Sequence, residues 1–170
     1  FDDLGDAGRA VAAIMQELTP SMLEIMDRQT LEVVEAWRPM GLDTTAGALL
    51  VAQTDSGAGA IADADRLIEL CERNGAREGY RSEDPEEAEM LLGARRMAIP
   101  ALESLGDWLL DDIAVPRSQL ARAMTMIAEL AVKHDVMIAT FGSVLFARVE
   151  RVEVETVAEP APVRLAPAPD

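Results

Sequence analysis

The segment from residue 112 to residue 142 constrains the fold most, because a strand, a helix and a second strand follow one another there. It reads DIAVPRSQLARAMTMIAELAVKHDVMIATFG. Proline follows the first apolar run, and apolar positions 120, 124, 127 and 131 then recur at helical spacing. The run 136–141 is largely apolar and ends at Gly142, which indicates a second strand. The segment therefore predicts a domain in which strands and helices alternate.

The same alternation is found along the rest of the chain. Amphipathic periodicity predicts helices and short apolar runs predict strands. The run 48–53 (ALLVAQ) is continuously apolar up to its last residue, which favours a central strand of a sheet. Such alternation is compatible with a parallel sheet. The predicted helices are 6–18, 29–37, 57–74, 84–105 and the segment after residue 118, and the predicted strands are 22–26, 48–53, 108–115 and 136–141.

Several residues predict where helices begin and end. Asp84 is followed by Pro85 and Glu87, which is typical of a helix start with a capping box. Ser118 is the predicted cap of the helix that follows it. The pair 74–75 (Asn-Gly) predicts a helix end. Pro100 predicts a kink or break in the helix 84–105.

Composition limits the classes of function. A chain of 170 residues with 49% hydrophobic residues is sufficient for one compact domain. The net charge of −16 argues against binding to nucleic acid or to an anionic membrane surface. No apolar run is long enough for a membrane-spanning helix. One cysteine excludes an internal disulfide and favours a reducing, cytoplasmic location.

The two ends of the chain differ from its middle. The N-terminus lacks an initiator methionine, which is typical of a fragment or a processed piece. After Gly142, the segment 143–158 contains an alternation of charged and apolar residues at 151–155, which predicts a half-exposed strand. The segment 159–170 (EPAPVRLAPAPD) is rich in alanine and proline, and we expect it to be a disordered tail.

Three segments together resemble the C-terminal (cap) domain of FAD-linked oxidases of the vanillyl-alcohol-oxidase type, such as glycolate oxidase flavin subunits and D-lactate dehydrogenases. Residues 23–28 (LEIMDR) resemble the first strand-to-helix segment of that domain. Residues 92–102 (LGARRMAIPAL) are similar to its W-x-x-R-x-x-x-x-P-A-L helix, with Leu92 in the place of the tryptophan. Residues 112–120 resemble its D-V-x-V-P-R-S-x-L segment. The resemblance covers residues 1–142.

The resemblance implies an α+β domain in which helices cover an antiparallel, ferredoxin-like sheet. Family members hold FAD in a separate N-terminal domain, and this cap closes over the flavin and substrate. Because Phe1 already matches the cap, we expect the FAD-binding domain to be missing here, and this chain alone to bind no FAD. In the family, Phe-Gly opens a His-x-x-Gly-Asp-Gly-Asn-x-His motif. Here residues 143–146 (SVLF) follow Gly142, so the expected histidine is a serine.

Arg95 is the candidate site residue, because it aligns with the arginine that holds the substrate carboxylate in the resembled family. A guanidinium presents two parallel donors to the two oxygens of a carboxylate. The alternative is a surface arginine paired with a glutamate of its own helix. Arg96, about 100° further around the helix, is predicted to be such a surface charge. The acidic partners considered for Arg95 are Glu87, Glu89 and Glu103.

Other potentially reactive residues have simpler structural interpretations. His134 is the only histidine and is predicted to lie at a helix end, so no metal site is expected. Cys71 is on an apolar helix stripe and should be inert. Asp111 and Asp112 are adjacent on a strand, so their carboxylates point to opposite faces. The loop 56–59 (SGAG) opens a helix but lacks the lysine and the third glycine of a phosphate loop, so a turn is favoured.

Two hypotheses of function follow. The first is the substrate cap of an FAD-dependent oxidoreductase that acts on a small 2-hydroxy acid such as glycolate or D-lactate. The second is a truncated or degenerate domain that packs against a protein partner and catalyses nothing. Either way, this chain alone is expected to be inactive, because the FAD-binding domain is expected to be missing. The missing histidine after Gly142 bears on the choice between the two.

Overall fold

A computed structural model describes residues 1–144 and 148–154, and for residues 91 and 148–154 it describes the backbone alone. The predicted helices and strands are all present, with ends that differ by a few residues. The helices are α1 (Leu4–Glu17), α2 (Arg28–Trp37), α3 (Ala60–Arg73), α4 (Pro85–Glu103) and α5 (Leu120–His134), and the strands are β1 (Met22–Asp27), β2 (Ala48–Gln53), β3 (Trp108–Ala114), β4 (Met137–Ser143) and β5 (Arg148–Val154).

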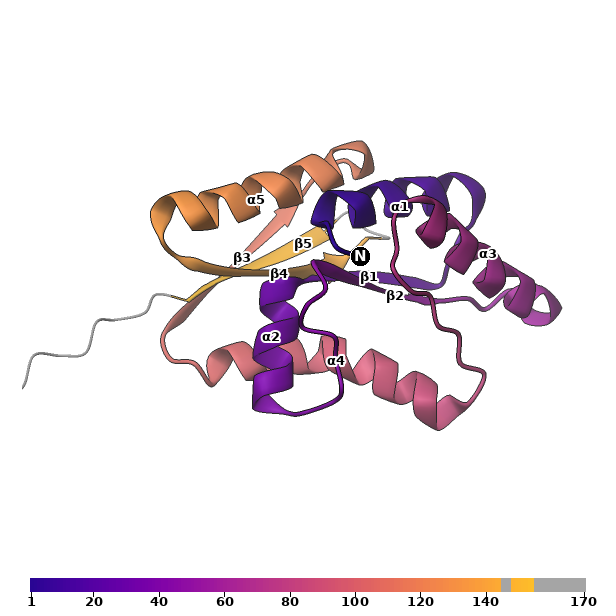
Figure 1. The fold of residues 1–170 in the computed structure, drawn as a ribbon, viewed down its shortest axis with the longest axis horizontal. Coiled ribbons are helices and arrows are strands. Elements are labelled where there is room, and N and C mark those ends of the chain that lie inside the picture. Colours follow the sequence, from indigo (N-terminus) through magenta and orange to yellow (C-terminus); the bar gives the residue numbers. More distant parts are fainter. Residues whose placement is uncertain (145–147, 155–170) are drawn as a thin grey trace, which may run out of the picture.

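The strands form one five-stranded sheet in the order β2-β1-β4-β5-β3. All four neighbouring pairs are antiparallel, so the expected α+β class is confirmed and a parallel sheet is not formed. Helices α1, α3 and α5 cover one face, and α2 and α4 cover the other (Figure 1). The domain therefore has three layers, with the sheet in the middle.

Each face of the sheet has its own hydrophobic core, because side chains alternate along the strands. On β1, Leu23 and Ile25 pack under α1 and α5, whereas Met26 packs under α2 and α4. Phe141 on β4 belongs to the second core and is fully buried. The face toward α2 and α4 also carries the candidate site.

The prediction that residues 48–53 form a central strand is wrong. The strand β2 lies at one edge of the sheet and pairs with β1. The run is apolar for a different reason: Leu50 packs against the core under α1, while Leu49 and Val51 pack against the core under α4. Helices on both faces produce the apolar pattern of a central strand in an edge strand.

The structure also corrects the predicted start of α5. A 3₁₀ turn, η2 (Arg117–Gln119), precedes the helix, and the Gln119 N–H donates to the carbonyl of Pro116 at 2.7 Å. Gln119 occupies the N-cap position without a side-chain capping hydrogen bond. Ser118 therefore lies inside the 3₁₀ turn and does not cap α5. The turn also supplies hydrogen-bond partners at this helix end, in place of a capping side chain.

One of the two predicted capping interactions is present at the start of α4. Asp84 caps the helix by accepting from the N–H groups of Glu86 and Glu87. The reciprocal half of the capping box is replaced, because the Asp84 N–H donates to the hydroxyl of Ser82. Pro100 does not break α4, which continues to Glu103. Proline removes the donor of one backbone hydrogen bond, and the helix continues for three residues beyond it.

The remaining predictions concern helix α3 and the C-terminal part. A 3₁₀ turn, η1 (Gly57–Gly59), precedes α3, and Gly75 ends it with a φ of 93°. The predicted strand at 151–155 corresponds to β5, which pairs with both β3 and β4. Residue 155 and the predicted tail 159–170 lie outside the described residues. Within the described part, no helix is long and apolar enough to cross a membrane.

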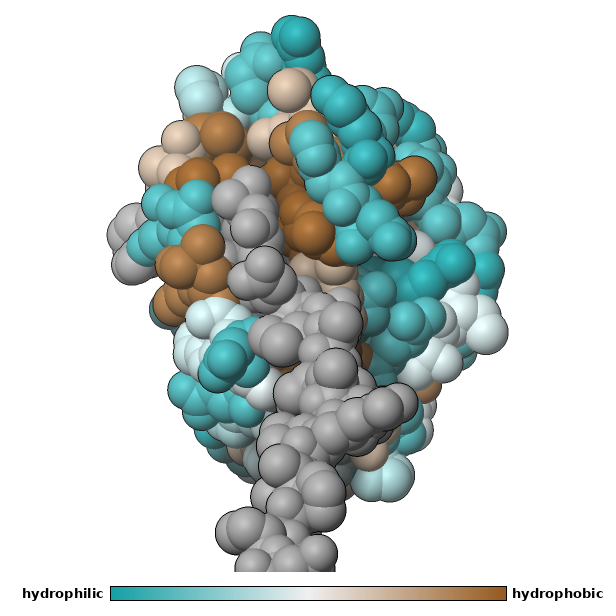
Figure 2. Space-filling view, turned by 90° about the vertical axis from the view of Figure 1, so that its left-hand side faces the viewer, coloured by the Kyte–Doolittle hydropathy of each residue, from teal (hydrophilic) through white to brown (hydrophobic). Residues whose placement is uncertain are grey.

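One end of the sheet carries exposed apolar side chains. The first residues of β3 and β4, Trp108 and Met137, both pair with Val154, so these strand starts lie together. Leu109 and Val136, next to them in the chain, are exposed. Apolar residues gather on this end of the molecule, as Figure 2 shows.

Candidate carboxylate-binding site

Arg95 lies on the face of α4 that packs on the sheet. Ala94, Ala98 and Ala101 are buried on this helix, and these small side chains allow the helix to approach the strands closely. The Arg95 side chain is 21% exposed and its Nε donates to Oε2 of Glu24 at 3.0 Å. Arg95 therefore points toward the sheet rather than to the outer surface of the helix.

Glu24 reaches Arg95 from the middle of β1. Its side chain is 13% exposed, and its backbone is paired with Val51 on β2 and with Ser143 on β4. Directly opposed residues share one face of a sheet, so all three side chains lie on the α4 side. Pairing on both sides places the Glu24 carboxylate on a rigid part of the domain.

The ring of Phe141 lies under the Arg95 guanidinium. The central carbon of the guanidinium is 4.5 Å from the centroid of this ring, within the range of a cation–π interaction. Phe141 lies two residues before Ser143 on β4, so the two side chains face the same side of the sheet. Arg95 is thus held by contacts with two neighbouring strands, β1 and β4.

A cavity of about 260 Å³ opens beside Arg95. Arginine donors can bind a carboxylate in it, and apolar walls suit a short aliphatic group. This volume is small for a ligand site, which suits a small organic acid. Its lining residues come from two strands and one helix: Met22, Glu24, Val51, Leu92, Arg95 and Arg96.

The two adjacent arginines differ as the helical geometry predicts. Arg96 is 60% exposed and forms an ion pair with Glu89, so it is the surface charge of the two. The partner predicted for Arg95 is a glutamate of its own helix, whereas the structure gives it an ion pair with Glu24, on another element. Glu87 instead accepts hydrogen bonds from Tyr80 and Ser82.

Sequence reasoning missed Glu24 and Phe141 as partners of Arg95. Glu24 does carry a signal, because it is a single charged residue within the run 22–26 (MLEIM). A charge in a buried strand requires a partner. Which cation pairs with it depends on the packing of α4 on β1, which the local pattern does not contain.

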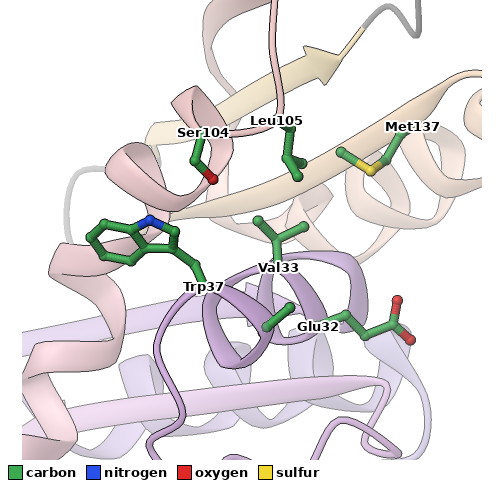
Figure 3. Close-up of a pocket in the computed structure, with 7 residues that line it drawn as sticks. Glu32, Val33, Trp37, Ser104, Leu105 and Met137 are labelled. Carbon is green, nitrogen blue, oxygen red and sulfur yellow. The ribbon is translucent and has the colours of Figure 1, made fainter.

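A second hollow, of about 420 Å³, lies between α2, the end of α4 and the start of β4 (Figure 3). It is mainly apolar, and Trp37 forms one wall of it. Among the described residues that line it, Glu32 is the charged one, so it does not suit a carboxylate. The lining residues are Glu32, Val33, Ala36, Trp37, Ser104, Leu105 and Met137.

The other singled-out residues lie apart from this site. His134 ends α5 and is exposed. Cys71 is half-buried in the core under α1, and burial raises the pKa of its thiol to about 11. Asp111 and Asp112 follow one another on β3 and point to opposite faces of the sheet, as predicted.

The described residues offer little to a phosphate, a flavin dinucleotide or a metal ion. The loop 56–59 does not suit a phosphate, because its Ser56 hydroxyl donates to the carboxylate of Asp63 at 2.5 Å. Neither hollow offers the several backbone or cationic donors that the pyrophosphate of FAD requires. Among the described side chains, which lie within residues 1–144, no three from His, Cys, Asp or Glu are grouped as metal ligands. The absence of bound metal or FAD stays a prediction.

The fold and this site define a helix-covered antiparallel domain with a partly buried arginine beside a small cavity. Residues 1–146 match the family model of FAD linked oxidases, C-terminal domain. The chain therefore belongs to this family, as its three motifs predict.

Curated relatives agree with this assignment. The chain is 32% identical over 145 residues to glycolate oxidase subunit GlcD of Bacillus subtilis, covering 84% of the chain and 31% of the relative. It is 27% identical over 142 residues to glycolate oxidase subunit GlcD of Escherichia coli K12, covering 82% of the chain and 28% of the relative. The chain thus spans about a third of the length of these relatives.

A solved structure is similar in fold. Alkyldihydroxyacetonephosphate synthase superposes with a TM-score of 0.60 over 90% of this chain and 34% of that structure. The sequence identity is 14%, so this likeness concerns the fold alone.

Proposed function

We propose that this chain is the substrate cap of an FAD-dependent oxidoreductase that acts on a small 2-hydroxy acid such as glycolate or D-lactate. Membership of the FAD-linked oxidase family supports the oxidoreductase class. The GlcD relatives support a 2-hydroxy acid as substrate. The observation that carries the proposal is the position of Arg95 beside a small cavity.

Arg95 would bind the substrate carboxylate. Its guanidinium is partly exposed at the cavity, and a planar fork of donors matches the two oxygens of a carboxylate. The side chains of Met22, Val51 and Leu92 would contact the carbon chain of the substrate. A cavity of this size favours a short acid such as glycolate or D-lactate over a long one.

The flavin itself would be held by a separate FAD-binding domain, where it would accept the hydride of the hydroxyl-bearing carbon. The described residues of this chain do not fit the dinucleotide, so their role is limited to binding and covering the substrate. We expect the isolated chain to purify without FAD. Absorbance near 450 nm at one flavin per chain would contradict this expectation.

A second function is favoured by one observation. Position 143, where the family's histidine is expected, is a serine, and it lies beside Glu24 in the sheet. A serine hydroxyl is a poor proton acceptor at neutral pH. A non-catalytic domain that only packs against a protein partner would show no turnover in the intact protein.

The two functions are separated by kinetics of the intact flavoprotein that contains this cap. We expect oxidation of glycolate or D-lactate with reduction of the bound FAD. Arg95→Lys should raise KM at least about tenfold, because lysine lacks the bidentate fork. Arg73→Lys is the matched control and should leave KM within about twofold, because Arg73 is exposed, is paired with Glu69 and lies on α3, on the opposite face of the sheet.

Two outcomes contradict the proposal. Absence of turnover with any small 2-hydroxy acid would favour the non-catalytic domain. Turnover with equal KM values for Arg95→Lys and the wild type would remove Arg95 from the site. We propose a cytoplasmic location for the intact protein, which fractionation of the producing cells would test.

A further inference from the structure

We infer that Glu24 is the positioning residue that holds the Arg95 guanidinium ready for a substrate carboxylate. The inference rests on the proposed function, because it concerns the same cavity. Glu24 lies next to the reacting acid in this proposal but does not bind it. Its partner is Arg95, at 3.0 Å from Oε2 to Nε.

Burial gives the first argument. Arg95 is 21% exposed and Glu24 13% exposed, so both charges have lost most of their contact with water. A desolvated charge without a partner is strongly unfavourable. Glu24 therefore keeps the guanidinium at the cavity before any substrate arrives.

Geometry gives the second argument. Glu24 approaches the edge of the guanidinium at Nε, and the ring of Phe141 lies 4.5 Å from its central carbon. The carboxylate restricts rotation of the guanidinium within its plane, and the ring restricts tilting of that plane. An unrestrained arginine has many rotamers, and a ligand that orders them binds more weakly.

The sheet makes this support rigid. The backbone of Glu24 is paired on one side with Val51 and on the other with Ser143. Both Val51 and Glu24 line the cavity, so the strand that positions the guanidinium also forms the cavity wall. Residues locked by a regular element hold a site more precisely than residues on loops.

A second role for Glu24, electrostatic repulsion of the substrate, would weaken substrate binding instead of supporting it. A carboxylate this close to Arg95 would also repel a substrate carboxylate, and it would then weaken binding. The Glu24→Gln variant separates the two roles, because the amide oxygen still accepts from Nε but carries no charge. Positioning predicts little change in KM, whereas competition predicts a lower KM.

The experiment uses the intact flavoprotein with glycolate and D-lactate as substrates. We expect Glu24→Gln to keep KM within about threefold, and Glu24→Ala to raise KM about tenfold or more with a smaller effect on kcat. Glu24→Asp keeps the charge but is too short to reach Nε, so its KM should also rise. Glu69→Ala, which removes an exposed partner of Arg73 on α3, is the matched control and should leave KM unchanged.

Urea unfolding of each variant separates positioning from stability. If Glu24→Ala does not fold, Glu24→Asp provides the test. A KM for Glu24→Asp equal to that of the wild type, or a KM for Glu24→Gln more than about threefold below it, would overturn the inference. Either result in an enzyme that still depends on Arg95 leaves the proposed function intact, whereas a wild-type protein without turnover overturns both.

Discussion

The carboxylate of Asp27 accepts a hydrogen bond from the backbone N–H of Thr140 at 2.8 Å. It thereby extends the pairing of β1 with β4 by a side chain, one residue beyond the last backbone pair, Met26–Phe141. Its other oxygen accepts from the backbone N–H and the hydroxyl of Thr30, which caps α2. One partly buried carboxylate therefore joins a helix start to a neighbouring strand.

The first prediction concerns the pH dependence of stability. Burial raises the pKa of Asp27 from 3.8 to about 6, although hydrogen bonds from Thr30 and Thr140 act in the opposite direction. A raised carboxyl pKa means that the folded state binds more protons than the unfolded state. The protonated Asp27 carboxyl therefore stabilises the folded state fully below pH 3.8, and this contribution is lost as the pH rises through about 6.

The measurement is urea unfolding of the wild type and Asp27→Asn across this range. Relative to the variant, the unfolding free energy of the wild type should fall by roughly 3 kcal/mol between low pH and neutrality. Asp3→Asn is the matched control, because Asp3 also caps a helix but is exposed. A difference between wild type and Asp27→Asn that does not change with pH would contradict the prediction.

The second prediction concerns the contact between α1 and α5. A Cβ at Gly8 would lie 2.5 Å from the Cβ of Ala121 and 2.7 Å from its Cα. Gly8→Ala should therefore separate the helices and lower the unfolding free energy by about 1–3 kcal/mol. In Gly93→Ala, on α4, the new Cβ meets the flexible end of Met40 at 3.3 Å.

The two glycine-to-alanine variants separate the effect of helix packing from the effect of helix propensity. Gly93→Ala should be neutral or should raise the unfolding free energy by up to about 1 kcal/mol, because alanine favours a helix. Both values come from chemical denaturation of the isolated chain. Equal effects at the two positions would show that the approach of α1 to α5 does not limit side-chain size at Gly8.

The local sequence pattern predicts well where the helices and strands lie in the chain. It predicts poorly which of these elements lie next to one another in the fold. Periodicity places every helix and strand, because each depends on which side chains of one segment are apolar. Sheet order depends on contacts between distant segments. The apolar run that begins at Ala48 therefore indicates burial on two faces but not whether the strand is central or at an edge.

The candidate site shows the same division. Arg95 is found from the motif of residues 92–102, which lies within one helix. Its partner Glu24 is 71 residues away in the chain, and no spacing rule connects the two. The joint role of Asp27 at a helix start and a strand end was missed for the same reason, because Thr140 is 113 residues away.

The third prediction concerns the single cysteine. Burial raises the pKa of the Cys71 thiol from 9.0 to about 11, so the thiolate fraction at pH 8 should fall about 100-fold. Labelling by a disulfide reagent should be slower than for a free thiol by about the same factor. In urea the rate should return to that of an unfolded thiol. Rapid labelling of the native chain at pH 8 would contradict the inert thiol.

The last prediction concerns the apolar end of the sheet. Leu109 is 60% exposed on β3, and Leu110 and Val136 are also exposed near it. Exposed apolar side chains grouped on one end favour association with another surface. We expect the isolated chain to bind a hydrophobic dye or to self-associate at this end.

Leu109→Asn tests this surface directly. It should lower dye fluorescence or the association constant measured by sedimentation, because it removes exposed apolar area without disturbing the backbone pairing with β5. Met90→Asn is the matched control, because Met90 is 65% exposed on α4, away from this end of the sheet. A monomer with little dye binding, or an equal loss for both variants, would show that the apolar end of the sheet is not an association surface.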